Sequence, residues 1–437
     1  MEANINTFTI KDTFTSWTWG DLAGLGLVLH IVLMIVMTLR VVSVQRNIGV
    51  SIAWVAVLYT LPIFGFVAYI LLGEPMIGRR YRERVDQASI LMNDMARREH
   101  LIFDKGQDLL PANYRGVSQI GTRWTGFGVF PNHQMQLLTD PASIFQRLIE
   151  DIHAAQRIVL MEFYIVYPKG QVLEVIEALS VAAQRGVECH ILADSVGSFS
   201  FINSSVHRKL EKAGVYVHQS LPVGLFKTLF KRSDLRNHRK MVVIDEHIGY
   251  IGSFNLVDPR FFKQNKNVGQ WIDVALRTTS QHSISINTAM AKVIVTDIGA
   301  ESNDNLAELH QRVNNYTRKL YVMHPTINDL NSRVKVLADT FDDHEQPDIG
   351  ATSIVVPKMP VVDKVLAQLI PSAPQLTAHV IYNTLVTVIH RANKPIRITT
   401  PYFVPDESLS GALTIAAKRG VDVTIIVPEK VDSFLVQ

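Results

Sequence analysis

Cysteine is almost absent from this sequence, which carries a single thiol among its 437 residues. No disulfide can form within the chain, and this is typical of a protein whose folded part lies in a reducing compartment. Cys189 lies in an apolar run that favours a buried strand, so we interpret it as a small core residue. The sequence also lacks the clustered cysteine, histidine and carboxylate residues of a metal site, so we expect neither a metal nor another cofactor.

An excess of charge of one sign is missing as well. The net charge is +3, and charged residues make up 19% of the chain. Domains that bind nucleic acids usually carry a strongly basic face, so this balance argues against a nucleic-acid partner. Apolar residues instead make up 47% of the chain, which favours a protein that is attached to a membrane.

Two long uncharged runs lie near the N-terminus. The run at 22–39 is long enough to cross a bilayer core, and a second run at 48–72 contains Pro62. The short polar turn between them predicts a transmembrane helical hairpin with spans at about 22–42 and 48–72. We favour a retained anchor over a cleaved signal peptide, because no basic segment precedes the first run and no small-residue cleavage site is evident.

Basic residues around the hairpin predict its orientation. Only Arg40 and Arg46 lie in the turn, whereas more basic residues flank the outer ends. The positive-inside rule therefore places both termini and the soluble part in the cytoplasm. The flanking residues are Lys11, Arg79, Arg80, Arg82 and Arg84.

Helical and strand patterns alternate further along the chain, and Gly186 stands where a left-handed residue would end a helix. Helices that alternate with short apolar strands predict a layered α/β domain. We expect helices over 142–155, 172–184 and 206–212, and strands over 157–166, 187–193 and 215–218.

A polar motif follows these segments. It reads His238-x-Lys240-x4-Asp245, and after six residues comes Gly-Ser253-x-Asn255. The first pattern alone is a weak motif, for which a solvated basic turn is the alternative interpretation. The second pattern at a fixed distance makes coincidence far less plausible.

Apolar residues at 241–244 and 248–251 predict two strands that bring the two polar patterns together. One edge of a pocket then holds an imidazole, an ammonium, a hydroxyl and an amide. An imidazole nitrogen can attack phosphorus as a nucleophile. The other three groups can donate hydrogen bonds to phosphoryl oxygens as charge develops in the transition state. The motif therefore predicts phosphodiester transfer through histidine.

These motifs resemble those of the phospholipase D superfamily, and nearly the whole chain is similar to bacterial cardiolipin synthases of the two-transmembrane type. The resemblance implies an enzyme of the bacterial cytoplasmic (inner) membrane that makes cardiolipin and glycerol from two phosphatidylglycerols through a phosphatidyl-histidine. It implies that His238, Lys240 and Asp245 form the catalytic motif, with Asp245 more a structural partner at the strand end than a proton-transfer group. Ser253 and Asn255 would bind phosphate.

A carboxylate after the second motif hydrogen-bonds the catalytic imidazole in the superfamily. Asp273, in the segment 269–274, is the residue of this chain that matches it. The alternative is that Asp273 is a surface carboxylate on a strand.

The C-terminal stretch repeats an earlier one. Residues 416–421 resemble 182–187, and 397–404 resemble 157–165. The 234-residue spacing of the repeat places a second His-x-Lys near position 472, but the sequence ends at Gln437 and contains no other His-x-Lys-x4-Asp.

Members of the superfamily use two copies of the motif, one histidine becoming the phospho-enzyme and the other serving as general acid and base. By resemblance, His238 could take either role. We therefore expect that the chain is C-terminally incomplete, or that a second chain supplies the partner motif; we favour the first.

The expected organisation combines a membrane hairpin with a phospholipase D-like α/β fold. Its parts are a hairpin at 1–78, a linker at 79–130, a first half with the motif at 131–290, a connector at 291–375 and an incomplete second half at 376–437.

The segment 221–239 is basic and amphipathic, which indicates either a contact with lipid headgroups or an ordinary surface loop. Two other functions stay open. One is a phospholipase D hydrolase, which would use water as acceptor and release phosphatidic acid. The other is a catalytically dead membrane protein with an interaction role.

Overall fold

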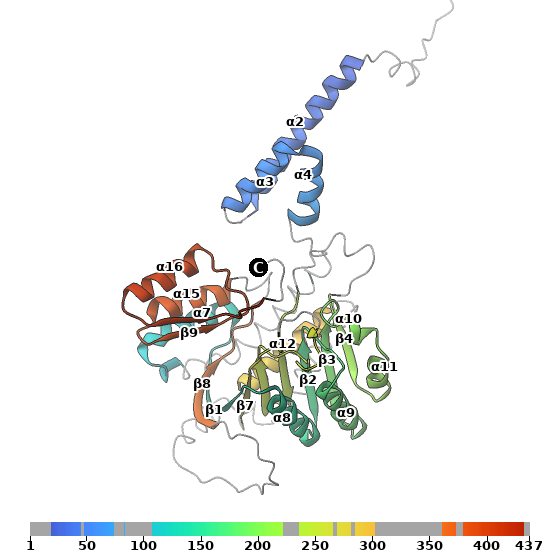
Figure 1. Ribbon diagram of the computed structural model, residues 1–437, viewed down its shortest axis with the longest axis vertical. Coiled ribbons are helices and arrows are strands. Elements are labelled where there is room, and N and C mark those ends of the chain that lie inside the picture. Colours follow the sequence, from blue (N-terminus) through green and yellow to red (C-terminus); the bar gives the residue numbers. More distant parts are fainter. Residues whose placement is uncertain are drawn as a thin grey trace, which may run out of the picture. The chain divides into compact units, whose positions relative to one another are not determined.

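A computed structural model of the protein describes residues 19–44, 48–73, 83, 107–221, 236–264, 269–280, 285–301, 361–372 and 379–431 (Figure 1). The chain divides into two compact units. The first comprises Met1–Ile77 and Gly224–Leu235, and the second comprises Gly78–Val223 and Arg236–Gln437. Most of the amphipathic segment 221–239 lies outside the described residues, as do Lys11 and the arginines that follow the hairpin.

The first unit contains a long helix and a broken one. Helix α2 (Trp19–Ser43) includes Gly24–Ser43, which is long and apolar enough to cross a membrane. The second predicted span is divided into α3 (Ile48–Thr60), α4 (Pro62–Ala68) and the π-helical turn η1 (Tyr69–Gly73). Pro62 explains the break, because it has no N–H to continue the α3 hydrogen-bond ladder. Among the described residues one helix has spanning length, and the second span stays a prediction.

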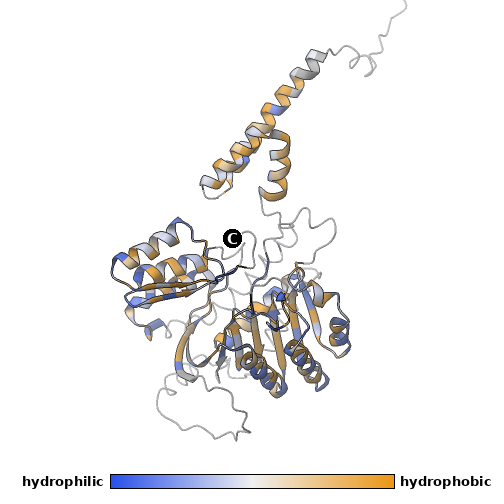
Figure 2. Cartoon of the chain, in the orientation of Figure 1, coloured by the Kyte–Doolittle hydropathy of each residue, from blue (hydrophilic) through white to orange (hydrophobic). Residues whose placement is uncertain are grey.

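Apolar residues predominate in these helices (Figure 2). Met37 and Val41 of α2 pack with Leu58 of α3 and with Tyr69. Most of the other large apolar side chains of α2 are exposed, which is the pattern expected of a helix that faces lipid.

The second unit is built on an eight-stranded mixed sheet. Its order is β4-β3-β2-β5-β6-β7-β1-β8, in which β2, β3 and β4 are parallel and the other pairs are antiparallel. The strands are β1 (Val129–Leu138), β2 (Ile158–Phe163), β3 (Glu188–Asp194), β4 (Tyr216–Ser220), β5 (Met241–Ile244), β6 (Ile248–Gly252), β7 (Ala275–Thr279) and β8 (Val361–Gln368).

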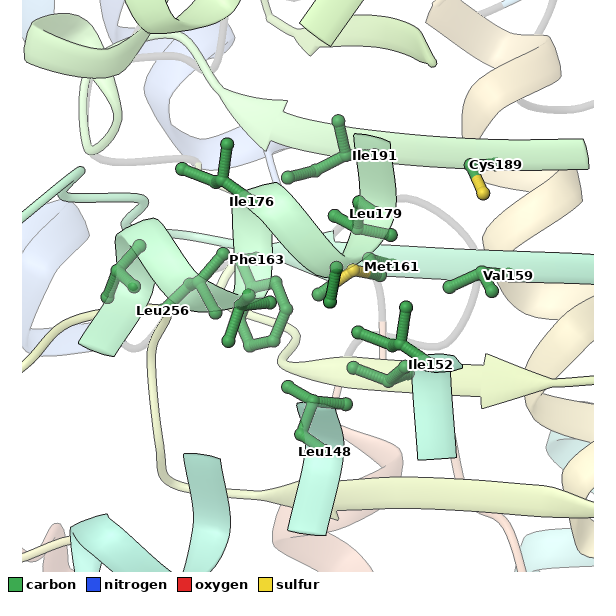
Figure 3. Close-up of a cluster of buried hydrophobic side chains, with 14 of the residues drawn as sticks. Leu148, Ile152, Val159, Met161, Phe163, Ile176, Leu179, Cys189, Ile191 and Leu256 are labelled. Carbon is green, nitrogen blue, oxygen red and sulfur yellow. The ribbon is translucent and has the colours of Figure 1, made fainter. Parts of the chain in front are cut away.

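Helices cover both faces of this sheet, which confirms the α/β layers expected from the sequence (Figure 1). One core forms where α8 and α9 pack on β2 and β3 (Figure 3). Cys189 is buried there, and burial raises the pKa of its thiol to about 12, so its prediction as a core residue is confirmed. The helices of this face are α8 (Pro141–Ala154), α9 (Gln171–Gln184), α10 (Phe199–Ile202) and α11 (Ser205–Lys212).

The opposite face is covered by α12 (Ile286–Glu301), whose residues are nearly all buried. Two elements lie where the sequence predicted only a linker and a connector. Helix α7 (Ala112–Thr125) lies within 79–130, and β8 pairs with β1 across more than 200 residues of chain. Gln368 ties the two together, because its Nε2 donates to the carbonyl oxygens of Ser118 and Phe127 at 3.0 and 2.9 Å.

A buried ion pair links α8 to the sheet. The guanidinium of Arg277 donates two hydrogen bonds to the carboxylate of Asp151, at 2.7 and 2.9 Å, and the hydroxyl of Tyr250 donates to the same carboxylate. Paired and hydrogen-bonded in this way, the two charges offset the loss of their hydration. The contact fixes β6 and β7 beneath α8.

The C-terminal residues form a second, two-stranded parallel sheet, as the repeat predicted. Arg419 donates to the carbonyl oxygens of Ile389 and Ala392, as Arg185 does to those of the corresponding helix end. The elements are α15 (Val380–Arg391), β9 (Ile396–Thr399), α16 (Glu407–Lys418) and β10 (Val423–Ile426).

Candidate active site

Strand register brings the two sequence motifs to one edge of the large sheet. Met241, at the start of β5, pairs with Glu162 near the end of β2 and with Ile251 near the end of β6. Gly252 then pairs with Ala275, the first residue of β7. The residues just before β5, just after β6 and just before β7 therefore share this edge.

Side chains alternate in direction along the segment that enters β5. Asn237 donates to the buried carboxylate of Glu162, and Arg239 donates to Asp297 of α12 and to the Ser372 carbonyl oxygen at 3.2 Å. These residues are directed toward the α12 side of the sheet, as are Met241 and Val243. Because side chains alternate in extended backbone, His238 and Lys240 are directed to the opposite side. Two anchors thus hold the histidine in place.

The imidazole of His238 packs on the ring of Tyr164, with ring centroids 4.2 Å apart and an interplanar angle of 32°. Its Nδ1 lies 3.2 Å from the carbonyl oxygen of Arg236. A carbonyl can only accept, so this contact places the proton on Nδ1 and leaves a lone pair on Nε2. Burial lowers the pKa of His238, the Arg236 hydrogen bond opposes this shift, and the positive charge of Lys240 adds to it. The neutral ring is therefore favoured.

Lys240 also lies near the ring of Tyr164. Its Nζ donates to the His238 carbonyl oxygen at 2.5 Å and lies 5.5 Å from the centroid of the Tyr164 ring. Burial lowers the pKa of Lys240 to about 8, although the carboxylates of Asp273 and Glu162 counteract this shift. The ammonium is a poorly hydrated cation, which is the state that binds a phosphate strongly.

Ser253 and Asp273 form a hydrogen-bonded pair at the same edge. The Ser253 hydroxyl donates to Oδ1 of Asp273 at 2.7 Å and accepts from the N–H of Val274 at 3.1 Å. Burial raises the pKa of Asp273, and the Ser253 hydrogen bond and the Lys240 charge oppose the rise. In the structure Asp273 thus contacts Ser253, whereas the His238 nitrogen contacts a backbone carbonyl. The expected bond from Asp273 to the imidazole stays a prediction.

Asn255 lies deeper than the other predicted site residues. Its side chain is buried, and its Oδ1 accepts from the N–H of Ile165 at 3.0 Å. The amide nitrogen is then the group that can donate to a phosphate. This contact also ties the chain after β6 to the end of β2, where Tyr164 lies.

Asp245 is separated from the other five predicted residues by the length of β5. Its carboxylate accepts from the backbone N–H groups of Gln156, Arg157 and Ile158 at 2.8, 2.8 and 2.9 Å. Its backbone has φ 51°, a left-handed conformation that aspartate tolerates. These contacts hold the end of β5 against the start of β2. Asp245 therefore has a structural role in the fold and does not lie beside the imidazole of His238.

Sequence reasoning missed several residues at this edge. Tyr164 supports the imidazole, and Glu162 is a buried carboxyl whose pKa burial and the nearby Asp297 raise. Asp194 accepts from the N–H groups of Val196 and Gly197, both at 2.9 Å, and its carboxylate lies 3.9 Å from the Arg236 guanidinium. The sequence does contain a signal for Glu162 and Asp194, because each carboxylate lies at the end of an apolar run that predicts a strand.

Comparisons with known proteins give two family matches and close relatives. The family described as "Cardiolipin synthase, PLD-like domain" matches residues 148–286 and 385–437, and the family "Phospholipase_D-nuclease N-terminal" matches 32–74. Cardiolipin synthase A of Erwinia tasmaniensis is 33% identical over 404 residues, which cover 92% of this chain and 73% of that protein. Cardiolipin synthase A of Escherichia fergusonii is 33% identical over 403 residues, with coverages of 91% and 73%.

A solved structure similar to this chain is the phosphatidylserine synthase of Haemophilus influenzae. It is 12% identical, the match covers 71% of this chain and 66% of that one, and the TM-score is 0.41. That score is too low to support an inference about the site.

Proposed function

Because the chain belongs to the cardiolipin synthase family of the phospholipase D superfamily, a family of phosphatidyltransferases, we propose how the edge around His238 carries out the transfer. The substrates proposed are two phosphatidylglycerols, and the products are cardiolipin and glycerol. The observation that carries this proposal is the contact of His238 Nδ1 with the Arg236 carbonyl oxygen at 3.2 Å, which directs the ring proton to the carbonyl and leaves the Nε2 lone pair available.

In the first step Nε2 of one motif histidine attacks the phosphorus of phosphatidylglycerol. A nitrogen–phosphorus bond forms, the bond from phosphorus to the glycerol oxygen breaks, and a second histidine gives that oxygen a proton. In the second step a hydroxyl of another phosphatidylglycerol attacks the phosphatidyl-histidine. It releases its proton to the second histidine, and the first ring is regenerated as cardiolipin forms. We assign the nucleophile to His238 because its Nδ1 proton has a carbonyl partner.

The other residues of the edge stabilise the charge that develops on the phosphoryl oxygens. Lys240 supplies an ammonium, and Ser253 and Asn255 supply a hydroxyl and an amide N–H. Ser253 now donates to Asp273, so binding a phosphate would require its hydroxyl to rotate. Asp273 could then turn to the imidazole, as the family resemblance implies. Tyr164 holds the ring in its orientation throughout.

The second histidine is outside the part of the fold described above. The 437 residues contain no other His-x-Lys-x4-Asp, and we propose two sources for it, residues encoded after Gln437 or a second chain. Reading the codons after Gln437 tests the first source, which predicts a further motif within about 50 codons. If none is encoded, activity that rises with protein concentration would support the second chain. No motif and no turnover would favour the dead membrane protein.

The test of the nucleophile uses His238→Ala, with the exposed His153 as the matched control. Proteoliposomes carrying both motifs are given phosphatidylglycerol labelled on phosphorus, and products and labelled protein are measured after an alkaline quench. We expect His238→Ala to lose cardiolipin synthesis and the base-stable label while its membrane insertion is unchanged. His153→Ala should keep both. Turnover of His238→Ala close to that of the parent would contradict the assignment.

The same assay separates the transferase from a hydrolase. Phosphatidic acid without cardiolipin would indicate that water, and not a lipid hydroxyl, is the acceptor. Cardiolipin with released glycerol would support the proposed transfer.

We also propose that the protein crosses the bacterial cytoplasmic membrane twice and keeps its catalytic part in the cytoplasm. The apolar helix α2 and the apolar character of α3 and α4 support a membrane attachment of this kind. Protease treatment of spheroplasts should leave the catalytic part intact, and cleavage from the outside would contradict the orientation.

A further inference from the structure

A group of aromatic and basic side chains lies next to the candidate site. The rings of Tyr167 and Phe262 have centroids 5.2 Å apart, and those of Phe262 and Trp271 are 4.9 Å apart. Trp271 precedes Asp273 by two residues, and Asp273 is bonded to Ser253. The group therefore continues from the catalytic edge. We call it the aromatic rim, and define it as Tyr167, Lys169, Phe261, Phe262, Lys263, Trp271 and Ile272.

Lysine ammonium groups lie over these rings. Nζ of Lys263 is 5.0 Å from the centroid of Trp271 and 5.6 Å from that of Phe262. Nζ of Lys169 is 5.3 Å from the centroid of Tyr167. Lysine can rest its apolar stem on a ring while its charge stays at a polar boundary, so the rim combines apolar area with positive charge.

The rim exposes apolar side chains that an aqueous surface would not favour. Ile272 is 91% exposed, and Phe261 is 49% exposed. Single exposed apolar residues are common, but here they adjoin three further aromatic rings and two lysines. Tryptophan, tyrosine and lysine together are the residues that proteins place at the boundary between water and lipid.

The loop that carries Phe261, Phe262 and Lys263 is fixed to the segment that follows Tyr167 and Lys169. Asp258 accepts from the N–H of Gln171 at 3.0 Å, and the Arg260 guanidinium donates two hydrogen bonds to it at 2.9 and 2.6 Å. Gly170, at φ +58°, lets this carboxylate approach, since a Cβ there would lie 2.1 Å from Oδ2 of Asp258. The rim is therefore presented in a set position beside the edge that holds His238.

We propose that the aromatic rim is the surface on which the catalytic unit rests on an anionic phospholipid bilayer. Ile272 and Phe261 enter the upper acyl region, Trp271 and Tyr167 lie at the headgroup level, and Lys169 and Lys263 contact phosphates. In this position the phosphate of a lipid lies beside Lys240 and Ser253 while the lipid stays in the bilayer. The inference rests on the proposed function only in that the substrate is a membrane lipid.

The test reads position rather than turnover. A fluorescent probe is attached to Ile272→Cys in the whole protein, reconstituted in vesicles that contain phosphatidylglycerol and a nitroxide-labelled lipid. Lys212→Cys is the matched control, because it is an exposed position at the end of α11, just before β4 begins. Since β4 ends at the catalytic edge, Lys212 lies toward the opposite edge of the sheet. Cys189 is buried, so the unmodified chain gives the blank. We expect strong quenching at 272 and little at 212.

Charge is tested with the same probe. Each lysine near an anionic surface contributes about fivefold to the occupancy of the lipid-contacting state. Lys169→Glu and Lys263→Glu should therefore reduce the quenching at 272 in vesicles that contain phosphatidylglycerol, and Lys212→Glu should not. Equal quenching at 272 and 212, or quenching at neither, would overturn the proposal. Charge-independent quenching at 272 would overturn the lysine contacts with phosphates.

The catalytic proposal and this one fail separately. His238→Ala that carries the probe at 272 should be quenched like the parent, because it changes the chemistry and not the surface. If turnover is lost while quenching persists, the rim stands whatever the nucleophile is. If turnover depends on His238 while the probe at 272 stays in water, the rim is wrong and the catalytic assignment is unaffected.

Discussion

The segment α8-β2-α9-β3 and the segment α15-β9-α16-β10 have the same order of elements and the same parallel strand pairing. Each second helix ends at an arginine that binds the end of the first helix, followed by a glycine with positive φ. Burial differs. Every residue of β2 is buried, whereas β9 and β10 contain no buried residue.

The difference teaches which parts of the site are local. The helix–strand pairs and their turns form in both segments from nearby residues. The catalytic edge needs more, because His238 packs on Tyr164 at the end of β2, and its neighbour Arg239 is bonded to Asp297 of α12. The segment at 380–426 has the frame, and in the described residues it has no counterpart of β5 to β7.

The largest expected effect comes from breaking the contact that ties β5 to the frame. Asp245→Ala removes the acceptor of three backbone N–H groups, and we expect a loss of about 4 kcal/mol in the free energy of unfolding. The matched control is Asp422→Ala, which removes the exposed pair between Arg397 and Asp422, 52% and 61% exposed, and should cost about 0.5 kcal/mol. Denaturant unfolding of the whole protein in detergent measures both.

Equal losses for these two variants would contradict the comparison, because they would mean that an exposed ion pair holds its strand as firmly as the three hydrogen bonds of Asp245 do, two of which are partly buried. A change in the pH profile of turnover with Asp245→Asn, under conditions where the protein is folded, would instead give that carboxylate a part in proton transfer.

Sequence patterns located the repeated frame well. The predicted helix 172–184 matches α9 except that α9 begins one residue earlier, and the strand 241–244 is β5. The pairing of β8 with β1 could not be predicted, because period-two patterns do not identify a partner more than 200 residues away.

The candidate site also has a part that local patterns predict and a part that depends on long-range contacts. Two strands and a turn were enough to predict that His238, Lys240 and Ser253 meet at one edge. The stacking of Tyr164 on the imidazole depends on the antiparallel register of β2 with β5, which no local pattern encodes. The choice of Asp273 between Ser253 and the imidazole is a side-chain rotation, which lies beyond what residue spacing can predict.

An effect of intermediate size is expected from the pH dependence of turnover, because the two segments differ in how their lysines are exposed. Lys240 is partly buried with a pKa of about 8, whereas Lys394, Lys418 and Lys430 of the C-terminal segment are exposed. The ammonium is lost as the pH rises through that value, so turnover should fall about tenfold for each pH unit above about 8. Lys240→Arg should lower turnover but abolish this alkaline fall, because guanidinium stays charged.

The acid side of the same profile reports His238. Because burial lowers its pKa, the neutral ring should persist to a pH below the ordinary value of about 6.5, and turnover should decline only below that point. An alkaline fall that persists in Lys240→Arg would show that another group titrates there.

The smallest expected effect tests what the two segments share. Gly186 and Gly420 have φ 92° and 85°, and no heavy atom lies within 4 Å of a Cβ built at either position. Alanine at each should therefore cost only backbone strain, about 1 kcal/mol in the free energy of unfolding, and the two losses should be equal although burial of their strands differs. Amide hydrogen exchange resolves the segments separately. A much larger loss at Gly186 would mean that the turn is held by the packed sheet around it, and equal losses would show that the turn is encoded within its own few residues.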